Sequence, residues 1–352
     1  MQTWEKIKNN PKLLEKYLIK EKVIDLIRHF FKSRDFREVF TPILVPVPSC
    51  EPNLEVFKTQ LKTAKEIKRE AFLILSPEYS IKKLLSSGIG NCFEITKCFR
   101  NNEEVSSFHQ PEFTMLEWYR INADYKKIMN DFENLFLDIV TGLAPKCNLK
   151  KWSYQDKKYD ISSPWIKISI SEAFKKYAGI DTKTLLSEKR LLKAAKKKGY
   201  KVDRKTSWEE IFYQILFNEV ELKLLKTNRP YFLYDYPTSL ASLSRKKKSD
   251  PRFAERFEVF LAGVELGNCF SELVDAKEQA SRFKKELSQR KINGKTNYPM
   301  DKELIKALSL GVPEVSGIAV GVDRLVMLVG NLESVSETNF FPADQLFDLP
   351  QS

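Results

Sequence analysis

Apolar residues first recur at helical spacing between residues 13 and 31. The positions that share this spacing are Leu14, Leu18, Val23, Ile24, Ile27 and Phe31. This period predicts an amphipathic helix with one face on a core. The segment Phe36–Pro42 follows and predicts a strand that ends at its proline, because proline lacks the backbone donor that a central strand needs. Together they predict a helix–strand unit early in the chain.

Two later stretches also show helical periodicity. Residues 125–143 and 208–225 each place apolar side chains along one face. The region between them is mostly helical in pattern, and neither a repeat nor a low-complexity linker divides the chain. We therefore expect a single domain, residues 1–352, with a mostly helical insertion at about 142–230.

The stretch from Phe99 to Tyr119 combines strand patterning with many titratable groups. Its second half alternates, so that Phe113, Met115 and Glu117 share one face. We expect two antiparallel strands joined by a polar loop. The titratable residues here are Arg100, Glu103, Glu104, His109, Glu112 and Glu117. A hairpin that presents a cation, carboxylates and an aromatic ring suits a polyphosphate attached to a flat base.

Two glutamates, Glu258 and Glu265, flank a second predicted turn at residues 262–263. Their odd separation would place them on opposite faces of one straight strand, but a hairpin can bring both to one side. Two carboxylates on one side suit Mg²⁺, which binds through carboxylates and substrate phosphates. Taken alone, two solvated glutamates on an edge strand are the commoner interpretation. Asn268 and Glu272 follow shortly after, among apolar residues. This cluster of polar residues favours a ligand-binding site over two solvated glutamates.

Two further segments carry candidate ligand-binding residues. A short apolar strand leads into Ser76-Pro77-Glu78 and a helix. Proline is favoured in the first turn of a helix and an acid near its positive N-terminal end, so the helix alone can explain both residues. The alternative is that Glu78 receives the ammonium group of a substrate. Near the C-terminus a glycine-containing turn reaches Gly321, and Arg324 follows at the start of an apolar helix. A lone turn of this kind indicates a ligand site only weakly.

Composition narrows the class of protein. The chain has 352 residues and a formal net charge of +12. That charge favours an acidic partner such as nucleic acid or an acidic protein, although a lysine-rich surface explains it equally well. No run approaches the roughly 18 apolar residues of a membrane span, and the N-terminus has no apolar signal core, so we expect a cytosolic protein. The five cysteines form no CxxC pair, so we expect free thiols rather than a zinc site.

These segments together resemble the class II aminoacyl-tRNA synthetases in their lysine-type form. The residues that carry the resemblance to motif 2 are Phe99, Arg100, His109, Pro111 to Thr114 and Glu117. The helix and strand that end at Pro42 resemble motif 1, and residues 311–328 resemble motif 3. The resemblance covers the chain from about Leu13 to Phe341. Within this group, the chain is similar to the elongation factor P β-lysine ligases, stand-alone paralogues of the lysyl-tRNA synthetase catalytic domain.

The resemblance implies an α+β fold of the class II synthetase type, with an antiparallel sheet flanked by helices and without the N-terminal OB domain. It also implies a homodimer formed through the helix and strand that end at Pro42. ATP and Mg²⁺ are the implied cofactors. The implied ATP-binding residues are Arg100, Glu103, His109, Phe113, Glu258, Glu265, Gly321 and Arg324. Of these, Arg100 and Arg324 are the implied catalytic residues. The implied metal ligands are Glu258 and Glu265. The loop before His109 is one residue longer than usual, so the motif 2 acid is Glu103 or Glu104.

The implied substrate is a lysine-like amino acid. The implied contacts are Ser76, Glu78, Glu117, Tyr119, Asn268, Glu272 and Ala319. Ser76, Ala319 and the pattern of residues 237–243 resemble the β-lysine ligases. We therefore expect an ATP-dependent ligase that activates (R)-β-lysine as an adenylate and transfers it to a lysine of elongation factor P. A truncated lysyl-tRNA synthetase that charges tRNA, and a catalytically silent paralogue that serves as a binding subunit, are the alternatives.

Overall fold

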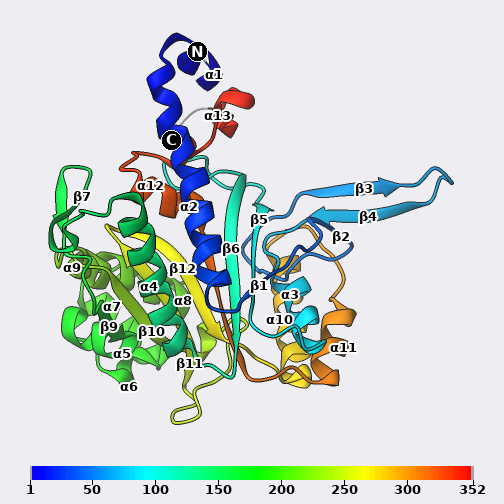
Figure 1. Cartoon of the computed structure of the whole chain (residues 1–352). Helices are drawn as coiled ribbons and strands as arrows, with labels where there is room; N and C mark the ends of the chain where they lie inside the picture. Colours follow the sequence, from blue (N-terminus) through cyan, green and yellow to red (C-terminus); the bar gives the residue numbers. More distant parts are fainter. Residues whose placement is uncertain (1, 350–352) are drawn as a thin grey trace. The chain divides into compact units, whose positions relative to one another are not determined.

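The structure is a computed structural model that describes residues 2–349. The chain divides into two compact units, one of Met1–Cys147 with Glu272–Ser352 and the other of Asn148–Ser271. Each unit combines helices with strands, so the α+β class expected from the sequence is confirmed (Figure 1). The single domain with a helical insertion stays a prediction.

The first unit carries the long helices and seven of the thirteen described strands. Its helices are α1 (Thr3–Asn9), α2 (Leu14–Lys32), α3 (Glu78–Ser86), α4 (Tyr125–Leu143), α10 (Ala276–Ile292), α11 (Lys302–Leu310), α12 (Val322–Val329) and α13 (Ala343–Leu346), with short 3-10 turns η1 (Pro11–Leu13) and η6 (Val335–Thr338). Its strands are β1 (Arg37–Glu38), β2 (Leu44–Val45), β3 (Lys58–Lys62), β4 (Lys68–Leu73), β5 (Cys92–Phe99), β6 (Glu112–Ile121) and β13 (Val315–Gly321).

Four of these strands lie in the order β1-β5-β6-β13. Strands β5 and β6 pair antiparallel, which confirms the hairpin predicted for residues 99–119, and β13 pairs antiparallel with β6. Strand β1 pairs with β5 in parallel and is only two residues long. The prediction of a strand through Pro42 was too long, because the backbone N–H of Thr41 donates to the carboxylate of Glu94 instead of a neighbouring strand.

Helices α2 and α4 supply the aromatic core over one face of β5 and β6. The ring of Phe31 stacks on Phe93 at 4.9 Å and contacts Trp118 at 5.1 Å between ring centroids. Trp118 in turn stacks on Phe132 of α4 at 6.4 Å. Met115, on the opposite face of β6, packs instead with Ile74, Cys98, Phe113 and Ala319. The strand alternation read from the sequence therefore separates a face covered by aromatic rings from the face that carries Met115 and Glu117.

The second unit is a sheet with helices packed against it. Its helical segments are η2 (Leu149–Lys151), α5 (Ile170–Ala173), η3 (Phe174–Ala178), α6 (Thr182–Leu185), α7 (Glu188–Lys197), α8 (Trp208–Ile215), η4 (Leu216–Glu221), α9 (Leu222–Leu225) and η5 (Thr238–Leu240). Its strands are β7 (Trp152–Tyr154), β8 (Lys157–Tyr159), β9 (Ile166–Ser169), β10 (Tyr231–Pro237), β11 (Phe253–Leu261) and β12 (Val264–Ser271). Strand β10 pairs in parallel with β9 and antiparallel with β11.

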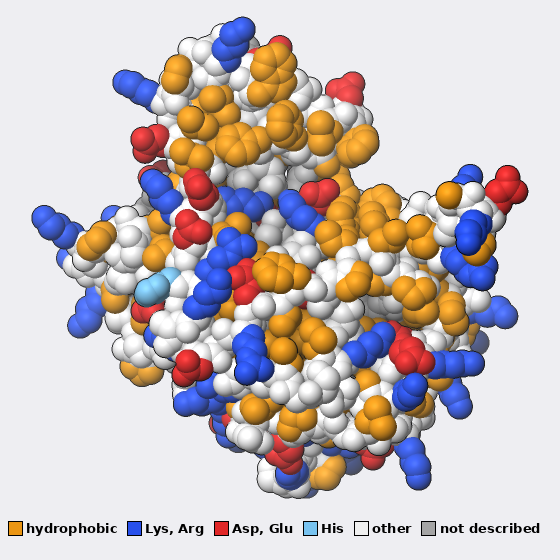
Figure 2. Space-filling model, turned by 45° about the vertical axis from the view of Figure 1, so that its right-hand side comes forward, with side chains coloured by type: hydrophobic (Ala, Val, Ile, Leu, Met, Phe, Trp, Pro, Cys, Tyr) orange, Lys and Arg blue, Asp and Glu red, His pale blue; other side chains and the backbone are white. Residues whose placement is uncertain are grey.

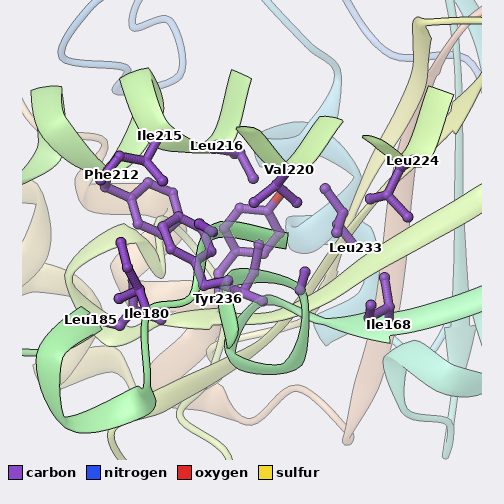
Figure 3. Packing of buried hydrophobic residues seen from close by; sticks show 14 of the residues in the cluster. Ile168, Ile180, Leu185, Phe212, Ile215, Leu216, Val220, Leu224, Leu233 and Tyr236 are labelled. Atoms are coloured by element: carbon purple, nitrogen blue, oxygen red, sulfur yellow. The ribbon is translucent and has the colours of Figure 1, made fainter. Parts of the chain in front are cut away.

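The helix predicted at 208–225 is continuous and forms one wall of this unit's core. It contains a central π-helical segment, η4, between α8 and α9. Its apolar face, including Phe212, Leu216 and Val220, packs towards Leu233 and Tyr236 of β10 (Figure 3). This packing holds β10, which pairs with β11 of the hairpin that carries the candidate metal ligands. Among the described residues, no helix has the length and apolar character to cross a membrane.

Candidate active site

Arg100 and Phe113 face each other across the β5–β6 hairpin. The backbone N–H of Arg100 donates to the carbonyl oxygen of Pro111 at 2.9 Å, which fixes Arg100 just beyond the paired strands. Its guanidinium lies 5.1 Å from the centre of the Phe113 ring. The Oε1 atom of Glu103 lies 3.7 Å from Nη1 of Arg100, so Glu103 is the acid of the loop that pairs with Arg100. The Nε atom of Arg100 is buried without a hydrogen-bond partner among the described residues, which leaves a donor for an anionic ligand.

His109 connects this loop to Arg324, which lies one turn into α12. The Nη2 atom of Arg324 lies 2.8 Å from Nε2 of His109, and its Nε donates to the carbonyl oxygen of Phe108 at 3.2 Å. Nδ1 of His109 lies 3.0 Å from the hydroxyl of Ser106. Burial and the neighbouring Arg324 lower the pKa of His109. A neutral His109 can therefore accept from Arg324 while it donates to Ser106. We call Arg100, Glu103, His109, Phe113 and Arg324 the guanidinium cluster.

Asp323 holds this cluster together, and the sequence analysis missed it. Its buried carboxylate accepts from the backbone N–H of Thr114 at 2.6 Å and from the hydroxyl of Thr338 at 3.0 Å. Lys20 of α2 donates to it at 2.5 Å. These contacts tie the start of α12 to the start of β6, so Arg324 is held near Phe113. An acid directly before Arg324, at the start of a helix whose remaining residues are apolar, was the signal that could have revealed it.

A second group of residues forms what we call the acidic cluster: Glu78, Glu117 and Glu272, with Ser76, Tyr119 and Lys82. The carboxylate of Glu117 accepts hydrogen bonds from the hydroxyls of Ser76 and Tyr119, the latter at 2.9 Å. Glu78 opens α3, and its backbone N–H donates to the Ser76 hydroxyl at 3.0 Å. All three carboxyl side chains are at least nine-tenths buried. The expected substrate contacts Ser76, Glu78, Glu117, Tyr119 and Glu272 therefore lie together in one unit.

The cluster is electrostatically strained when no cationic ligand is present. Burial raises the pKa of Glu117 to about 8, helped by the charge of Glu78 and opposed by the hydrogen bonds from Ser76 and Tyr119. Burial also raises the pKa of Glu272, although Lys82 acts against this shift. Each shift shows that the environment disfavours a second and third negative charge. A cationic ligand would remove that penalty.

Strand β13 brings small residues against this cluster. Ala319 lies opposite Glu117, and Gly317 lies opposite Tyr119. A side chain at Gly317 would come within 2.4 Å of the Tyr119 ring, so glycine is required there. At Gly321 an added Cβ would approach Arg324 no closer than 3.7 Å, so no described atom of the protein demands glycine at that position.

Ser76 also borders a cavity beside the acidic cluster. The cavity has a volume of about 530 Å³ and is lined by Tyr79, Lys83, Asp301 and the proline-containing segment 44–48, among others. This volume falls within the range of small-molecule sites. The acidic cluster therefore lies next to a space that can admit a small ligand.

In the second unit, a register shift in the β11–β12 hairpin brings Glu258, Glu265 and Asn268 to one face. Glu258 lies opposite Asn268, whereas Glu265 lies opposite Phe260, because the pairing shifts between Val259 and Phe260. The predicted turn is present, with positive φ angles of 55° at residue 262 and 82° at residue 263. We call this element the glutamate hairpin.

Arg256, another residue that the sequence analysis missed, pairs with Glu258. Its Nη2 donates to Glu258 at 2.6 Å and its Nε donates to Asn268 at 3.2 Å. The hydroxyl of Tyr236 donates to the other oxygen of Glu258 at 2.7 Å. Arginine two positions before the glutamate, and so on the same strand face, was the available signal.

The glutamate hairpin has a donor set that suits a hard cation. Burial, together with the charges of Glu258 and Glu265, raises the pKa of Glu221 to about 8. The negative charge of these carboxylates therefore exceeds the positive charge that Arg256 supplies. Carboxylate oxygens are the ligands that Mg²⁺ prefers, and the ion usually takes only one or two from protein. Among residues 2–349, no three His, Cys, Asp or Glu side chains are grouped to hold a metal by themselves. The residues fit an ion that is completed by substrate phosphates and water.

Known proteins match the chain along nearly its whole length. The family described as "tRNA synthetases class II (D, K and N)" matches residues 2–345. A lysine--tRNA ligase of Campylobacter jejuni (strain RM1221) is 35% identical over 335 residues, which cover 95% of this chain and 64% of that protein. An elongation factor P--(R)-beta-lysine ligase of Proteus mirabilis (strain HI4320) is 36% identical over 326 residues, which cover 92% of this chain and 94% of that protein. The chain thus spans under two thirds of the first relative and most of the second.

Proposed function

Because the chain belongs to the class II tRNA synthetase family (D, K and N), we propose that it is an AMP-forming ligase that activates a lysine-like amino acid with ATP. The observation that carries this proposal is the acidic cluster. It offers three buried carboxyl groups to a ligand that must bring positive charge. Lysine and its β-isomer carry two ammonium groups, and charge pairing in a dry site favours them over neutral side chains.

The proposed reaction needs no nucleophilic side chain. The substrate carboxylate attacks the α-phosphorus of ATP in line, the bond to the bridging oxygen breaks, and pyrophosphate leaves. We assign Arg100 to the α-phosphate and the attacking carboxylate, because its buried Nε has no hydrogen-bond partner within the part of the chain that the structure describes. Positioning of the reactants and neutralisation of charge on the phosphorus then supply the rate enhancement.

The other members of the guanidinium cluster would hold the nucleotide. Phe113 offers one face of a ring and Arg324 a planar cation, so the adenine base can lie between them. His109 would contact the terminal phosphate, and its contact with Arg324 supports a shared role. Glu258 and Glu265 would hold Mg²⁺, which neutralises the β and γ phosphates when bound.

We propose that the activated amino acid is (R)-β-lysine. We propose a lysine of elongation factor P as the acceptor. Ser76 and Ala319 support this choice, since both lie at the acidic cluster, where one methyl group changes the shape of the site. The Proteus mirabilis relative, which carries that activity in its name, aligns over most of its length. Transfer to tRNA remains the second candidate, because lysine--tRNA ligases are equally similar in sequence. The cytosolic location stays a prediction.

We further propose that the protein is a homodimer through the α2–β1 region. Phe40 is 80% exposed, and the neighbouring Ile43 and Leu44 are also exposed. Large apolar side chains grouped on one surface are typical of an interface.

A two-stage assay tests the proposed activity. Amino-acid-dependent exchange of pyrophosphate into ATP is measured with α-lysine and (R)-β-lysine, and the activated amino acid is then offered to tRNA or to elongation factor P. We expect exchange with a lysine-like amino acid and transfer to the protein. Charging of tRNA would replace the elongation factor P assignment, and absence of exchange with every amino acid would support a silent paralogue.

A further inference from the structure

Lys82 is a cation inside the acidic cluster that the proposed reaction does not use. It lies on α3, four residues after Glu78, and is 3% exposed. Its Nζ lies 2.6 Å from Oε1 of Glu78 and 2.6 Å from Oε2 of Glu272. Burial lowers the pKa of Lys82, but Glu272 and Glu78 together raise it above its ordinary value. The side chain is therefore charged within this cluster.

The charge of Lys82 sets the charge that the cluster presents to a ligand. Glu78, Glu117 and Glu272 supply three carboxyl groups, and Lys82 supplies one ammonium group. When all are ionised, the cluster retains two negative charges. Because uncompensated buried charge is costly, a ligand with two ammonium groups would balance the cluster, whereas a ligand with one would leave an acid unpaired.

The position of Lys82 also fixes the spacing of two acids from distant segments. Glu78 lies on α3, and Glu272 follows β12, with its backbone N–H donating to the carbonyl oxygen of Val315 at 2.9 Å. One ammonium group, hydrogen-bonded to Glu78 and ion-paired with Glu272, holds the two carboxylates at a set separation. Glu117 is held independently by Ser76 and Tyr119. Without Lys82, two of the three acids would repel each other and move apart.

We propose that Lys82 is a positioning residue that gives the acidic cluster its preference for an amino acid with two ammonium groups at the spacing found in lysine. This inference rests on the proposed function, because it takes the acidic cluster as the substrate site. It assigns the selectivity to an internal cation as well as to the acids that contact the substrate.

Lys82→Met tests the inference, since methionine is similar in length and carries no charge. Exchange kinetics are measured with lysine and with ornithine, which is one methylene shorter. We expect the KM for lysine to rise at least about tenfold with a smaller change in kcat, and the preference for lysine over ornithine to fall. Lys82→Arg keeps the charge and should restore most of the preference. Lys58→Met is the matched control, because Lys58 is an exposed lysine of β3 in the same unit and pairs with Glu70 instead; it should leave the KM for lysine unchanged.

The outcomes separate this inference from the proposed function. If the wild-type protein shows neither exchange nor calorimetric binding with lysine, the proposed function fails and this inference fails with it. If the wild type is active but a folded Lys82→Met protein keeps its KM and its preference, only the role of Lys82 is wrong. Should Lys82→Met not fold, Lys82→Arg decides the question: a preference for lysine that is lost despite the retained charge contradicts the inference, and a retained preference supports it.

Discussion

At the scale of single residues, the acidic cluster combines groups that disfavour one another in the empty protein. Glu117 and Glu272 are buried close to Glu78, and burial raises the pKa of both. Binding sites often store this kind of unfavourable energy, which a ligand of opposite charge then releases. The cluster is therefore built for a bound cation more than for stability.

The stability of the empty protein should fall as the pH rises from about 5 to about 8. The pKa of Glu117 is raised from 4.5 to about 8 in the folded state, so the folded protein binds more protons than the unfolded chain in this window. The free energy of unfolding then decreases by at most about 1.4 kcal/mol per pH unit for this group. Thermal unfolding at several pH values measures it. Saturating lysine should reduce the decline, and Glu117→Gln should make it shallower without abolishing it, because burial also raises the pKa of Glu272 and of Glu221. An equally steep decline in Glu117→Gln would contradict the assignment.

Arg100→Ala should lower the kcat of pyrophosphate exchange by about 100-fold or more, because a preorganised donor to the reacting phosphate is lost. Exchange kinetics at saturating ATP and lysine measure this effect. Arg252→Ala is the control, since Arg252 pairs with Asp250 at 60% exposure and should behave like the wild type. An Arg100→Ala protein with more than a tenth of the normal kcat would remove Arg100 from the proposed reaction.

Sequence patterns located the residues that lie within motifs. They did not locate residues whose partners come from other elements of the fold. Arg100, His109 and Glu117 stand in a hairpin that the alternation predicted, and the structure pairs those strands. The sequence could suggest that Lys82 pairs with Glu78, four residues earlier on a predicted helix. Its second partner, Glu272, is distant in sequence, and only the folded chain brings the two together. Asp323 likewise acts through Lys20 and Thr338, which come from other elements.

At the scale of elements, the positions of turns were easier to predict than the register of the strands that the turns connect. The turn at residues 262–263 was expected, and both residues have positive φ angles. The shift in register between Val259 and Phe260 is what places Glu265 on the same face as Glu258. Register depends on packing of the whole sheet, so the sequence alone left these glutamates open to either interpretation. Strand β1 was predicted too long for a similar reason, because the Glu94 side chain takes the Thr41 N–H.

Glu265→Ala should abolish exchange at every Mg²⁺ concentration tested while leaving the fold and the dimer intact. The reason is that one of the two proposed metal ligands is lost, whereas the Glu265 side chain is only half-buried, so its truncation removes little packing. Exchange assays over a Mg²⁺ series and sedimentation measure the two properties. Glu209→Ala removes an exposed acid from α8 of the same unit and should keep activity. Retained exchange in Glu265→Ala would exclude it from the metal site.

At the scale of the whole molecule, the net charge of +12 suits an acidic acceptor. Figure 2 shows Lys and Arg side chains spread over the visible face, with acidic and apolar side chains among them. Charge distributed in this way speeds association with an acidic partner more than it selects one. The choice between protein and tRNA therefore depends on contacts that composition does not reveal.

Phe40→Glu should raise the dissociation constant of the homodimer at least about tenfold, because an exposed aromatic ring at the proposed interface is replaced by a charge. Sedimentation velocity over a range of concentrations measures this. Phe217→Glu is the control, since Phe217 is also exposed but lies in the other unit. A dimer unaffected by Phe40→Glu would place the interface elsewhere.

Substrate charge provides the most direct test of the central claim that buried acids select a dicationic amino acid. Pyrophosphate exchange is measured with lysine, with (R)-β-lysine and with norleucine, which has the shape of the lysine side chain without its terminal ammonium. We expect exchange with at least one of the two lysines and none above background with norleucine. Exchange with norleucine as efficient as with either lysine would contradict it.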